Sequence, residues 1–549
     1  MKKIFFVVGV IFAMAQGTLA QTYQVPVSEA DEPMMKGTFK PTWESLENNY
    51  KVPDWFKNAK FGIWAHWGPQ CVEGTGDWMA RSMYIEGSRE YKYHVEHYGH
   101  PSEFGFKDLL PLFKAEKWDP DKLVAFYKKI GAQYFFALGN HHDNFDLWDS
   151  KYQPWNSMNM GPKKDILAGW AAAAKKYNLP FGISFHADHA WTWYEPSQRY
   201  DRNGDKIGVS YDGTLTKADG KGKWWEGYDP QDLYAQNHPM SKGSWADGMI
   251  SRQWVWGNGA AIPSQKFCTN FYNRTIDAIN RYNPDLVYFD VTVVPFYPVS
   301  DAGLKIAAHF YNHNMATHKG KLEAVMFGKI LDKNQRKGLV WDVERGAPNQ
   351  IQKTPWQTCS CIGGWHYNTS IYENNGYKSA ASVVKLLVDI VSKNGNLLLS
   401  VPLKADGSFD EKEEKILNEF GAWMDINKEA IYDTHPWKVF GEGPIAESDK
   451  KTGAHDFNEG SYTHATSEEK RFTQTSKALY VTILAWPSEQ KVIIKSLGLN
   501  SNLFQKKISR VELLGYGKIP FTRTVEGLIL TLPSKRLNDI APVIKIKTT

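Results

Sequence analysis

The sequence predicts an α/β protein in which a (β/α)8-like barrel is followed by a C-terminal antiparallel β-sandwich. Three observations lead to this prediction. Strand patterns alternate with helical patterns over roughly 370 residues, a length that suits a closed barrel with insertions. Short strand patterns without helices follow residue 431. Ionisable side chains stand directly after several barrel strands, where barrel enzymes carry their chemistry. We therefore expect a catalytic domain at 21–430 and a second domain at 431–549.

Apolar runs and helical periodicity define the elements of the expected barrel. A parallel strand that is buried on both faces needs apolar residues throughout, and a helix needs them on one face. The expected strands are 60–66, 134–138, 180–185, 286–290 and 396–401. The expected helices are 120–130, 165–177, 275–283 and 381–392. Asp119 stands where the first of these helices needs an N-cap.

Two segments before residue 431 depart from this alternation, and so does the C-terminal domain as a whole. Residues 21–50 form a leading arm with Pro, Glu and Asp, and residues 194–251 are rich in Gly, Asp and Trp. We interpret the second of these segments as a long loop insertion on the catalytic face. The strands expected in the C-terminal domain are 478–484, 491–495, 508–513, 528–532 and 543–546.

The N-terminus has the pattern of a secretion signal. Lys2 and Lys3 precede an apolar run over residues 4–15, and small residues lead to Ala20. The run is too short to span a bilayer, so we expect a signal peptide at 1–20 that is cleaved after Ala20. The mature protein is expected to be exported, periplasmic or extracellular, with no membrane partner.

The composition argues against one class of partner and favours another. The formal net charge of +5 is spread without a basic stripe, so no nucleic-acid partner is expected. The chain holds 22 Trp, 27 Tyr and 28 Phe, whose flat rings suit the apolar C–H faces of sugars. Four cysteines are too few for a disulfide scaffold, and we expect buried free thiols rather than a bridge. They are Cys71, Cys268, Cys359 and Cys361.

Histidines and a carboxylate gather where the expected strands end. His66 ends the first strand, His141 and His142 follow the run at 134–138, and Asp290 ends the strand at 286–290. The carboxyl ends of barrel strands share one face, so we expect these side chains at one site. Two chemistries fit such a cluster, a hydrolytic metal site and glycoside cleavage.

The metal-dependent hydrolase is the less favoured of the two. Such barrels often have His-x-His on the first strand, and His66-Trp67-Gly68 lacks that pattern. Further histidines with ligand-like spacing have no obvious acidic ligand beside them, so we interpret them as structural. They are His94, His97, His100, His309 and His313. We expect no metal and no cofactor.

Glycoside cleavage needs two carboxylates with different roles. One attacks or stabilises the anomeric carbon, and the other protonates the leaving oxygen. Asp290 suits the first role. The run from Val340 to Gly346 offers Asp342 and Glu344 for the second role.

Seven motifs in a fixed order then point to one family. They are WFKNAKFGIWAHWG at 55–68, DWM at 77–79, HHDNF with DS and WNS within 141–157, PDLVYFD at 284–290, WQTC to WHYN at 356–368, SKNGNLLL at 392–399, and HPW to GEGP at 435–444. Together they resemble the motifs of glycoside hydrolase family 29, the retaining α-L-fucosidases. The resemblance implies a barrel enzyme that acts on a fucosylated oligosaccharide or glycoconjugate.

The resemblance also implies roles for residues. Asp290 would be the nucleophile that forms a covalent fucosyl-enzyme. The acid/base is poorly marked in the family. We favour Glu344, which precedes Trp356 by about the usual stretch, and keep Asp342 as the alternative. The expected sugar-binding residues are His66, Asp77, Trp78, His141, His142, His186 and Trp365.

Several positions depart from the family pattern. Asp77 stands where a Glu is usual, and Gln357 replaces the Glu of a Trp-Glu pair. Ser184-Phe185-His186 replaces a Tyr-Tyr-Ser-like strand end, so His186 or Asp188 would take the place of a hydroxyl group.

The predicted function is exo-acting release of terminal α-L-fucose by a retaining double displacement. The alternatives are the same mechanism on a related sugar such as α-L-galactose, and a non-catalytic glycan-binding barrel. Linkage preference, oligomeric state and the role of the β domain stay open.

Overall fold

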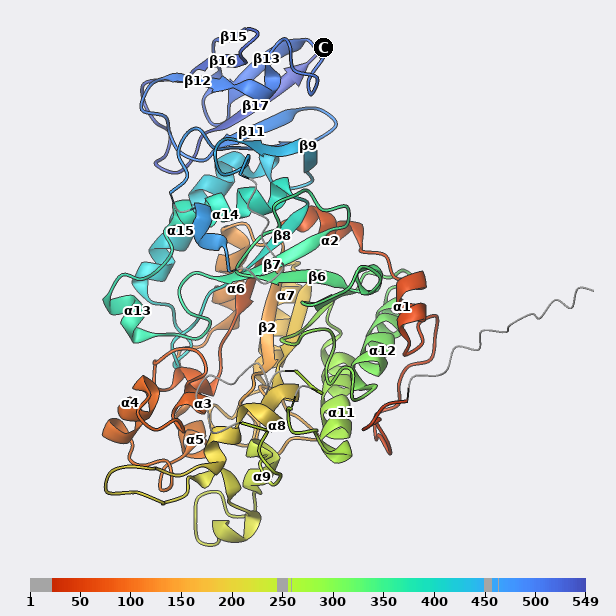
Figure 1. The fold of residues 1–549 in the computed structure, drawn as a ribbon, viewed down its shortest axis with the longest axis vertical. Helices are drawn as coiled ribbons and strands as arrows, with labels where there is room; N and C mark the ends of the chain where they lie inside the picture. Colours follow the sequence, from red (N-terminus) through yellow and green to blue (C-terminus); the bar gives the residue numbers. More distant parts are fainter. Residues whose placement is uncertain (1–21, 244–254, 258, 449–456, 463) are drawn as a thin grey trace, which may run out of the picture.

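The computed structural model describes residues 22–243, 255–257, 259–448, 457–462 and 464–549. The expected signal peptide and residues 244–251 of the expected insertion lie outside the described residues. Figure 1 shows the C-terminal sheets in blue at one end of the long axis and the insertion in yellow at the other end. The barrel lies between them.

Eight parallel strands close into a barrel, as predicted. Nearly all their residues are buried, because the barrel interior covers one face and the helices cover the other. The strands are β1 (Phe61–Ala65), β2 (Tyr134–Asn140), β3 (Phe181–Phe185), β4 (Leu286–Phe289), β5 (Val325–Gly328), β6 (Val340–Glu344), β7 (Trp356–Cys361) and β8 (Gly395–Ser400). The sequence did not predict β5, β6 and β7 as strands.

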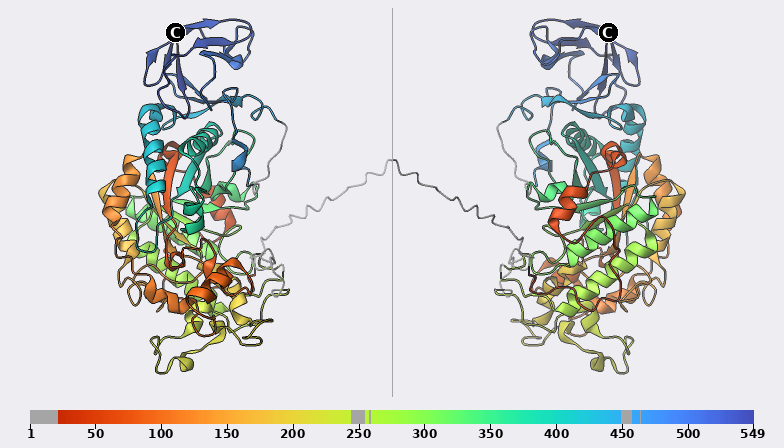
Figure 2. Two further views of the ribbon diagram at one scale, coloured as in Figure 1. Left: turned by 90° about the vertical axis from the view of Figure 1, so that its left-hand side faces the viewer. Right: turned by 90° about the vertical axis from the view of Figure 1, so that its right-hand side faces the viewer.

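Long helices surround the barrel (Figure 2). They are α6 (Pro120–Lys129), α7 (Ile166–Lys176), α11 (Gln265–Tyr282), α12 (Ala302–Thr317), α14 (Ala380–Ser392) and α15 (Glu411–Asn427). Asp119 caps α6 by accepting from the backbone N–H of Lys122, as expected. The helix expected at 275–283 is the second half of α11, which begins at Gln265 because Ser264 provides its N-cap. The sequence did not predict α12 and α15.

Short helices occupy the arm, the loops and the insertion. They are α1 (Trp43–Asn49), α2 (Asp54–Ala59), α3 (Met79–Ser82), α4 (Arg89–His97), α5 (Phe106–Leu109), α8 (Ala190–Trp193), α9 (Pro230–Tyr234) and α13 (Thr369–Glu373). The expected loop at 194–251 therefore contains helical turns. Buried Asp212 fastens it to the barrel loops, accepting from Lys107 at 2.8 Å and from Tyr84 at 2.7 Å.

The C-terminal domain consists of two antiparallel sheets, as predicted. One has the order β14-β13-β17-β11-β10-β9 and the other has the order β12-β16-β15. Apolar side chains such as Phe472, Val481 and Leu530 form a core separate from that of the barrel. The strands are β9 (His435–Glu442), β10 (Lys470–Gln474), β11 (Leu479–Ile483), β12 (Lys491–Ile494), β13 (Ile508–Leu513), β14 (Gly517–Lys518), β15 (Phe521–Arg523), β16 (Leu528–Thr531) and β17 (Val543–Thr548).

Two expectations about the chain as a whole can be compared with the structure. All four cysteines are free and buried, which confirms the expectation of unbridged thiols. None of the helices in the described residues has the length and apolar character needed to cross a membrane.

Candidate active site

A pocket of about 590 Å³ opens at the carboxyl ends of the barrel strands. This volume is in the range of small-ligand sites. Its walls combine aromatic side chains with histidines and carboxylates. The lining residues are Trp64, His66, Asp77, Trp78, His141, His186, Val255, Tyr288, Asp290, Val291, Thr292, Lys329, Ile330, Glu344, Cys359, Trp365 and Phe457.

Asp290 lies directly after β4 and faces this pocket. His142 Nε2 is 3.2 Å from Asp290 Oδ2, and Lys329 Nζ donates to Asp290 Oδ1. Burial raises the pKa of Asp290, but the charge of Lys329 and the hydrogen bond with His142 outweigh it and hold the pKa well below the usual range. Asp290 is therefore a carboxylate that stays ionised at neutral pH.

Lys329 links the two carboxylates of the pocket. Its ammonium group also lies 2.6 Å from Glu344 Oε2. Burial lowers the pKa of Lys329, but Asp290 and Glu344 together raise it well above its ordinary value. One ammonium that contacts both carboxylates keeps their nearest oxygens within two hydrogen-bond lengths of each other. This spacing fits the separation of about 5–5.5 Å expected between the carboxyl groups of retaining glycosidases, rather than the larger separation of inverting ones.

Asp342, two residues before Glu344, is in a different environment. It is fully buried and accepts from Gln357 Nε2 at 2.9 Å and from the Tyr288 hydroxyl at 3.1 Å. Burial raises its pKa to about 6. Asp342 does not line the pocket, so the geometry favours Glu344 over Asp342 for proton transfer.

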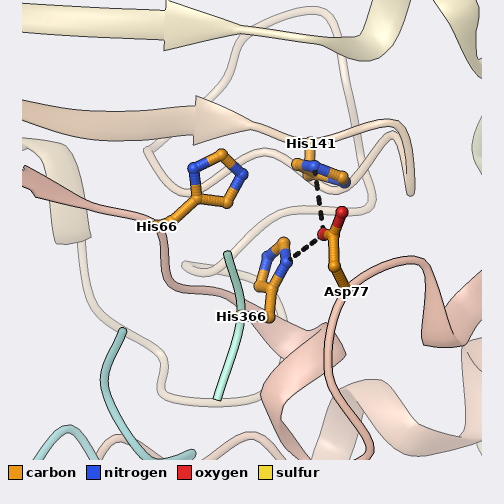
Figure 3. A group of neighbouring side chains, drawn as sticks. All are labelled: His66, Asp77, His141 and His366. Atoms are coloured by element: carbon orange, nitrogen blue, oxygen red, sulfur yellow. Dashed lines mark hydrogen bonds and ion pairs between the residues drawn. The ribbon is translucent and has the colours of Figure 1, made fainter. Parts of the chain in front are cut away.

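Figure 3 shows a cluster of imidazoles around Asp77. His66 comes from the end of β1, His141 from the end of β2 and His366 from the loop after β7. His366 Nδ1 is 2.7 Å from Asp77 Oδ1, and His141 Nε2 is 3.8 Å from the same oxygen. On its other side, His141 Nδ1 lies 2.6 Å from the Gln70 side-chain nitrogen.

Three buried histidines of the site, His66, His141 and His186, are neutral. Burial, followed by the charges of neighbouring histidines, holds the pKa of His66 and of His141 well below the usual range. Burial also lowers the pKa of His186, although Asp290 opposes the shift. A neutral imidazole has one donor and one acceptor nitrogen, which suits sugar hydroxyl groups.

The same side chains have the spacing of a metal site. Ligand atoms of His66, Asp77, His141 and His366 lie within 4.8 Å of one another, as do those of His141, His142 and His186. His and carboxylate ligands in this number suit zinc. His141 Nδ1 lies beside the Gln70 side-chain nitrogen, and His366 Nδ1 lies beside Asp77, which is itself a member of the first group.

The other histidines with ligand-like spacing lie elsewhere. Within the described residues, neither potential metal-binding group includes His94, His97, His100, His309 or His313. His94 lies 2.5 Å from Glu73 and 2.7 Å from the carbonyl oxygen of Phe104, so its ring holds two segments together. These contacts agree with the structural interpretation of His94.

All the expected sugar-binding residues except His142 line the pocket. His142 does not line it but contacts Asp290. His186 lines the pocket and neither ring nitrogen has a hydrogen-bond partner among the described residues, whereas Asp188 is buried behind the wall. Of the two replacements considered for the missing hydroxyl, His186 is therefore the one in position. Trp365 packs beside His66 with ring centroids 5.6 Å apart. Trp78 has φ +63°, a left-handed conformation that is rare for a bulky residue and clusters at functional sites.

Sequence reasoning missed three contributors to the site. Lys329 follows β5, which was not recognised as a strand, so nothing marked Lys329 as a strand-end residue. His366 stands in the WHYN motif next to Trp365 and could have been found there. Phe457 precedes β10 by more than ten residues and carries no motif.

Comparison with known proteins places the chain among characterised relatives. Residues 27–429 match the family model described as alpha-L-fucosidase, and residues 464–547 match that of the alpha-L-fucosidase C-terminal domain. The chain is similar to mouse tissue alpha-L-fucosidase, with 25% identity over 90% of each chain. It is also similar to rat tissue alpha-L-fucosidase, with 24% identity over 90% of this chain and 88% of the relative. A solved structure of Thermotoga maritima alpha-fucosidase in complex with fucose is 25% identical, with a TM-score of 0.65 over 92% of this chain and all of that one.

Proposed function

The chain belongs to the alpha-L-fucosidase family of glycoside hydrolases, and from that premise we propose that it releases terminal α-L-fucose with retention of configuration. Asp290 is the nucleophile and Glu344 is the acid/base. The observation that carries this proposal is the ammonium group of Lys329, which contacts both carboxylates. It supports the close spacing that a double displacement requires.

In the first step, an ionised Asp290 oxygen attacks C1 of fucose. The bond from C1 to the leaving oxygen breaks, and Glu344 delivers a proton to that oxygen. In the second step, Glu344 takes a proton from water, which attacks C1 and releases Asp290. Two inversions at C1 give net retention.

The imidazole cluster orients the sugar for this attack. The neutral rings of His66, His141 and His186 exchange hydrogen bonds with the hydroxyl groups, while Trp78 and Trp365 offer flat surfaces to the C–H face. The Thermotoga structure is a complex with fucose, and its likeness covers 92% of this chain. We propose that the equivalent pocket here binds fucose with His66, Asp77, His141, His142 and His186.

The choice between fucose and a related sugar depends on the group carried by C5 of the sugar. Fucose has a methyl group where L-galactose has a hydroxymethyl group. Product analysis with fucosylated oligosaccharides and with aryl α-L-fucoside and aryl α-L-galactoside measures this preference. We expect fucose release, and NMR should show the α-anomer as first product. A β-anomer, or preference for the galactoside, would overturn this assignment.

We also propose that the protein is exported. The Lys2-Lys3 start, the apolar run and Ala20 support cleavage of a signal peptide. N-terminal sequencing of the mature protein from its native host tests this. A first residue at Gln21 is expected, and an intact Met1 would contradict it.

A further inference from the structure

A segment that follows β9 of the C-terminal domain returns to the mouth of the barrel. Its described part includes the short helix η9 (Glu459–Tyr462), which Figure 2 shows in blue beside the barrel and apart from the blue sheets. The side chain of Phe457, directly before this helix, lines the same pocket as Asp290 and Glu344. The C-terminal domain therefore supplies part of the pocket wall.

This segment is fastened to the barrel by specific polar contacts. Glu459 accepts from Arg345 Nε at 2.7 Å and from the Ser360 hydroxyl, and it pairs with Lys378 at 3.1 Å. Asn458 accepts from the Ala347 backbone N–H and donates to the Ala347 carbonyl oxygen, both at 3.0 Å. Contacts of this number and direction fix the segment in one register against the loop after β6.

The anchoring places an exposed aromatic ring beside the proposed acid/base. Arg345 immediately follows Glu344, and its guanidinium lies 5.8 Å from the centre of the Phe457 ring. Phe457 is 60% exposed, although a side chain of this size is usually covered. Two more exposed apolar side chains, Ile330 and Val255, line the same pocket. Three exposed apolar groups in a pocket that also holds histidines and carboxylates indicate a second binding position.

The positions of the polar and charged side chains indicate which part of the substrate contacts these apolar groups. The imidazoles, Asp77 and Asp290 surround the position of the cleaved sugar. The leaving oxygen must face Glu344, so the group attached to it extends towards Arg345 and Phe457. An aromatic ring at that position suits the C–H face of a pyranose.

We propose that Phe457, held by Glu459 and Asn458, forms a subsite for the leaving-group sugar and stacks on its apolar face. This inference rests on the proposed function and names the class of aglycone, a pyranose with an uninterrupted C–H face. The C-terminal domain then contributes directly to substrate selection.

Reactivation of a trapped enzyme tests the subsite apart from the chemistry. A 2-deoxy-2-fluorofucosyl fluoride should label Asp290, and the label is then lost slowly to water or faster to an acceptor sugar. Methyl β-D-galactopyranoside and methyl N-acetyl-β-D-glucosaminide serve as pyranose acceptors, and methanol serves as an acceptor without a ring. In the wild type, at least one pyranose should accelerate reactivation with saturation, and methanol should not saturate.

Phe457→Ala should raise the half-saturating pyranose concentration about ten-fold, equivalent to about 1.4 kcal/mol, and change the rate of reactivation by water much less. Glu459→Ala should show the same pattern because it releases the anchor. Phe521→Ala, which removes an exposed ring from β15, is the matched control and should behave as wild type.

Three outcomes would count against the inference. Unchanged pyranose reactivation in Phe457→Ala would overturn the subsite alone. Equal losses with water and with pyranose would show that Phe457 supports the fold of the loop instead. A wild type that the fluorosugar does not label would overturn the proposed function, and the subsite with it.

Discussion

Two groups of buried charges in this protein have similar chemistry and opposite arrangements. At the junction of the domains, Arg471 of β10 donates to Asp389 of α14 at 2.6 Å and to Glu469 at 3.0 Å, and Lys393 donates to Asp389 at 2.6 Å. All four side chains are almost fully buried. The two cations and two carboxylates balance in charge.

The pocket holds one cation between two carboxylates. Lys329, Asp290 and Glu344 are each partly exposed to the pocket. Around them, ring nitrogens of His66, His186 and His366 have no hydrogen-bond partner among the described residues. Buried polar atoms without partners are costly. We infer that the charges at the junction stabilise the fold, whereas polar atoms of the pocket can form hydrogen bonds with a substrate.

The largest effect is expected from Asp290→Asn, which removes the proposed nucleophile. We expect kcat/KM to fall at least about 10⁴-fold, equivalent to about 5.4 kcal/mol, because the amide cannot form the covalent intermediate. Hydrolysis of an aryl α-L-fucoside measures the loss, and thermal unfolding checks that the fold is intact. Wild-type turnover by this variant would refute the nucleophile assignment.

Glu344→Ala and Asp342→Ala together show which of the two carboxylates near the end of β6 transfers the proton. In Glu344→Ala, we expect turnover of substrates with poor leaving groups to fall about 10²–10⁴-fold. Azide should restore turnover of an activated aryl α-L-fucoside, because azide attacks C1 of the fucosyl-enzyme without the help of a general base. Asp342→Ala should mainly reduce stability, since Gln357 and Tyr288 lose their buried acceptor. Full activity in Glu344→Ala, with loss confined to Asp342→Ala, would reverse the assignment.

Asp389→Ala tests whether the buried charges at the domain junction stabilise the protein. Its removal leaves Arg471 and Lys393 buried with too few acceptors, so the free energy of unfolding should fall by about 3–5 kcal/mol. Denaturant unfolding measures this, and activity per folded molecule should not change. Burial raises the pKa of Asp389, but Lys393 and Arg471 outweigh it and lower the pKa overall. The contribution is therefore present above the unfolded pKa of an Asp and is lost as pH falls through the folded pKa.

Lys329→Gln tests the role of the cation that Asp290 and Glu344 share. We expect kcat/KM to fall about 10–100-fold, because a charge that supports Asp290 is removed. Lys329 holds the pKa of Asp290 below the usual range, so its loss should raise that pKa. Since the ionised carboxylate is required, the acid limb of the pH profile should move to higher pH. Lys176→Gln on the exposed surface of α7 is the control. An unmoved acid limb would assign Lys329 a packing role.

The smallest expected effect is that of a chelator. The cluster of His66, Asp77, His141 and His366 has ligand-like spacing, but we assign it to sugar hydroxyls. Prolonged incubation with EDTA should leave kcat and KM unchanged. Loss of activity that zinc restores would make the cluster a metal centre and revive the metal-dependent hydrolase.

The barrel and the family were predictable because their signals are local. Apolar runs marked five of the strands, and His66, His141, His142 and Asp290 stand at strand ends in recognisable motifs. Strand β7 was missed because Gln357, Thr358 and Ser360 are polar. They are buried because Asp342, the Val343 carbonyl oxygen and Glu459 satisfy them.

The parts of the site that were not predicted depend on partners distant in sequence. Lys329 is significant because the fold brings it to both Asp290 and Glu344, 39 and 15 residues away. Glu459 reaches Arg345 across 114 residues. No periodicity in one sequence records such pairings.

The central claim is that Asp290, paired with Lys329 and His142, becomes covalently linked to fucose. Mass spectrometry of the protein after reaction with 2-deoxy-2-fluorofucosyl fluoride tests it most directly. We expect one fluorofucosyl group per molecule, on the peptide that contains Asp290. A label on any other residue, or an unlabelled protein that still hydrolyses fucosides, would contradict it.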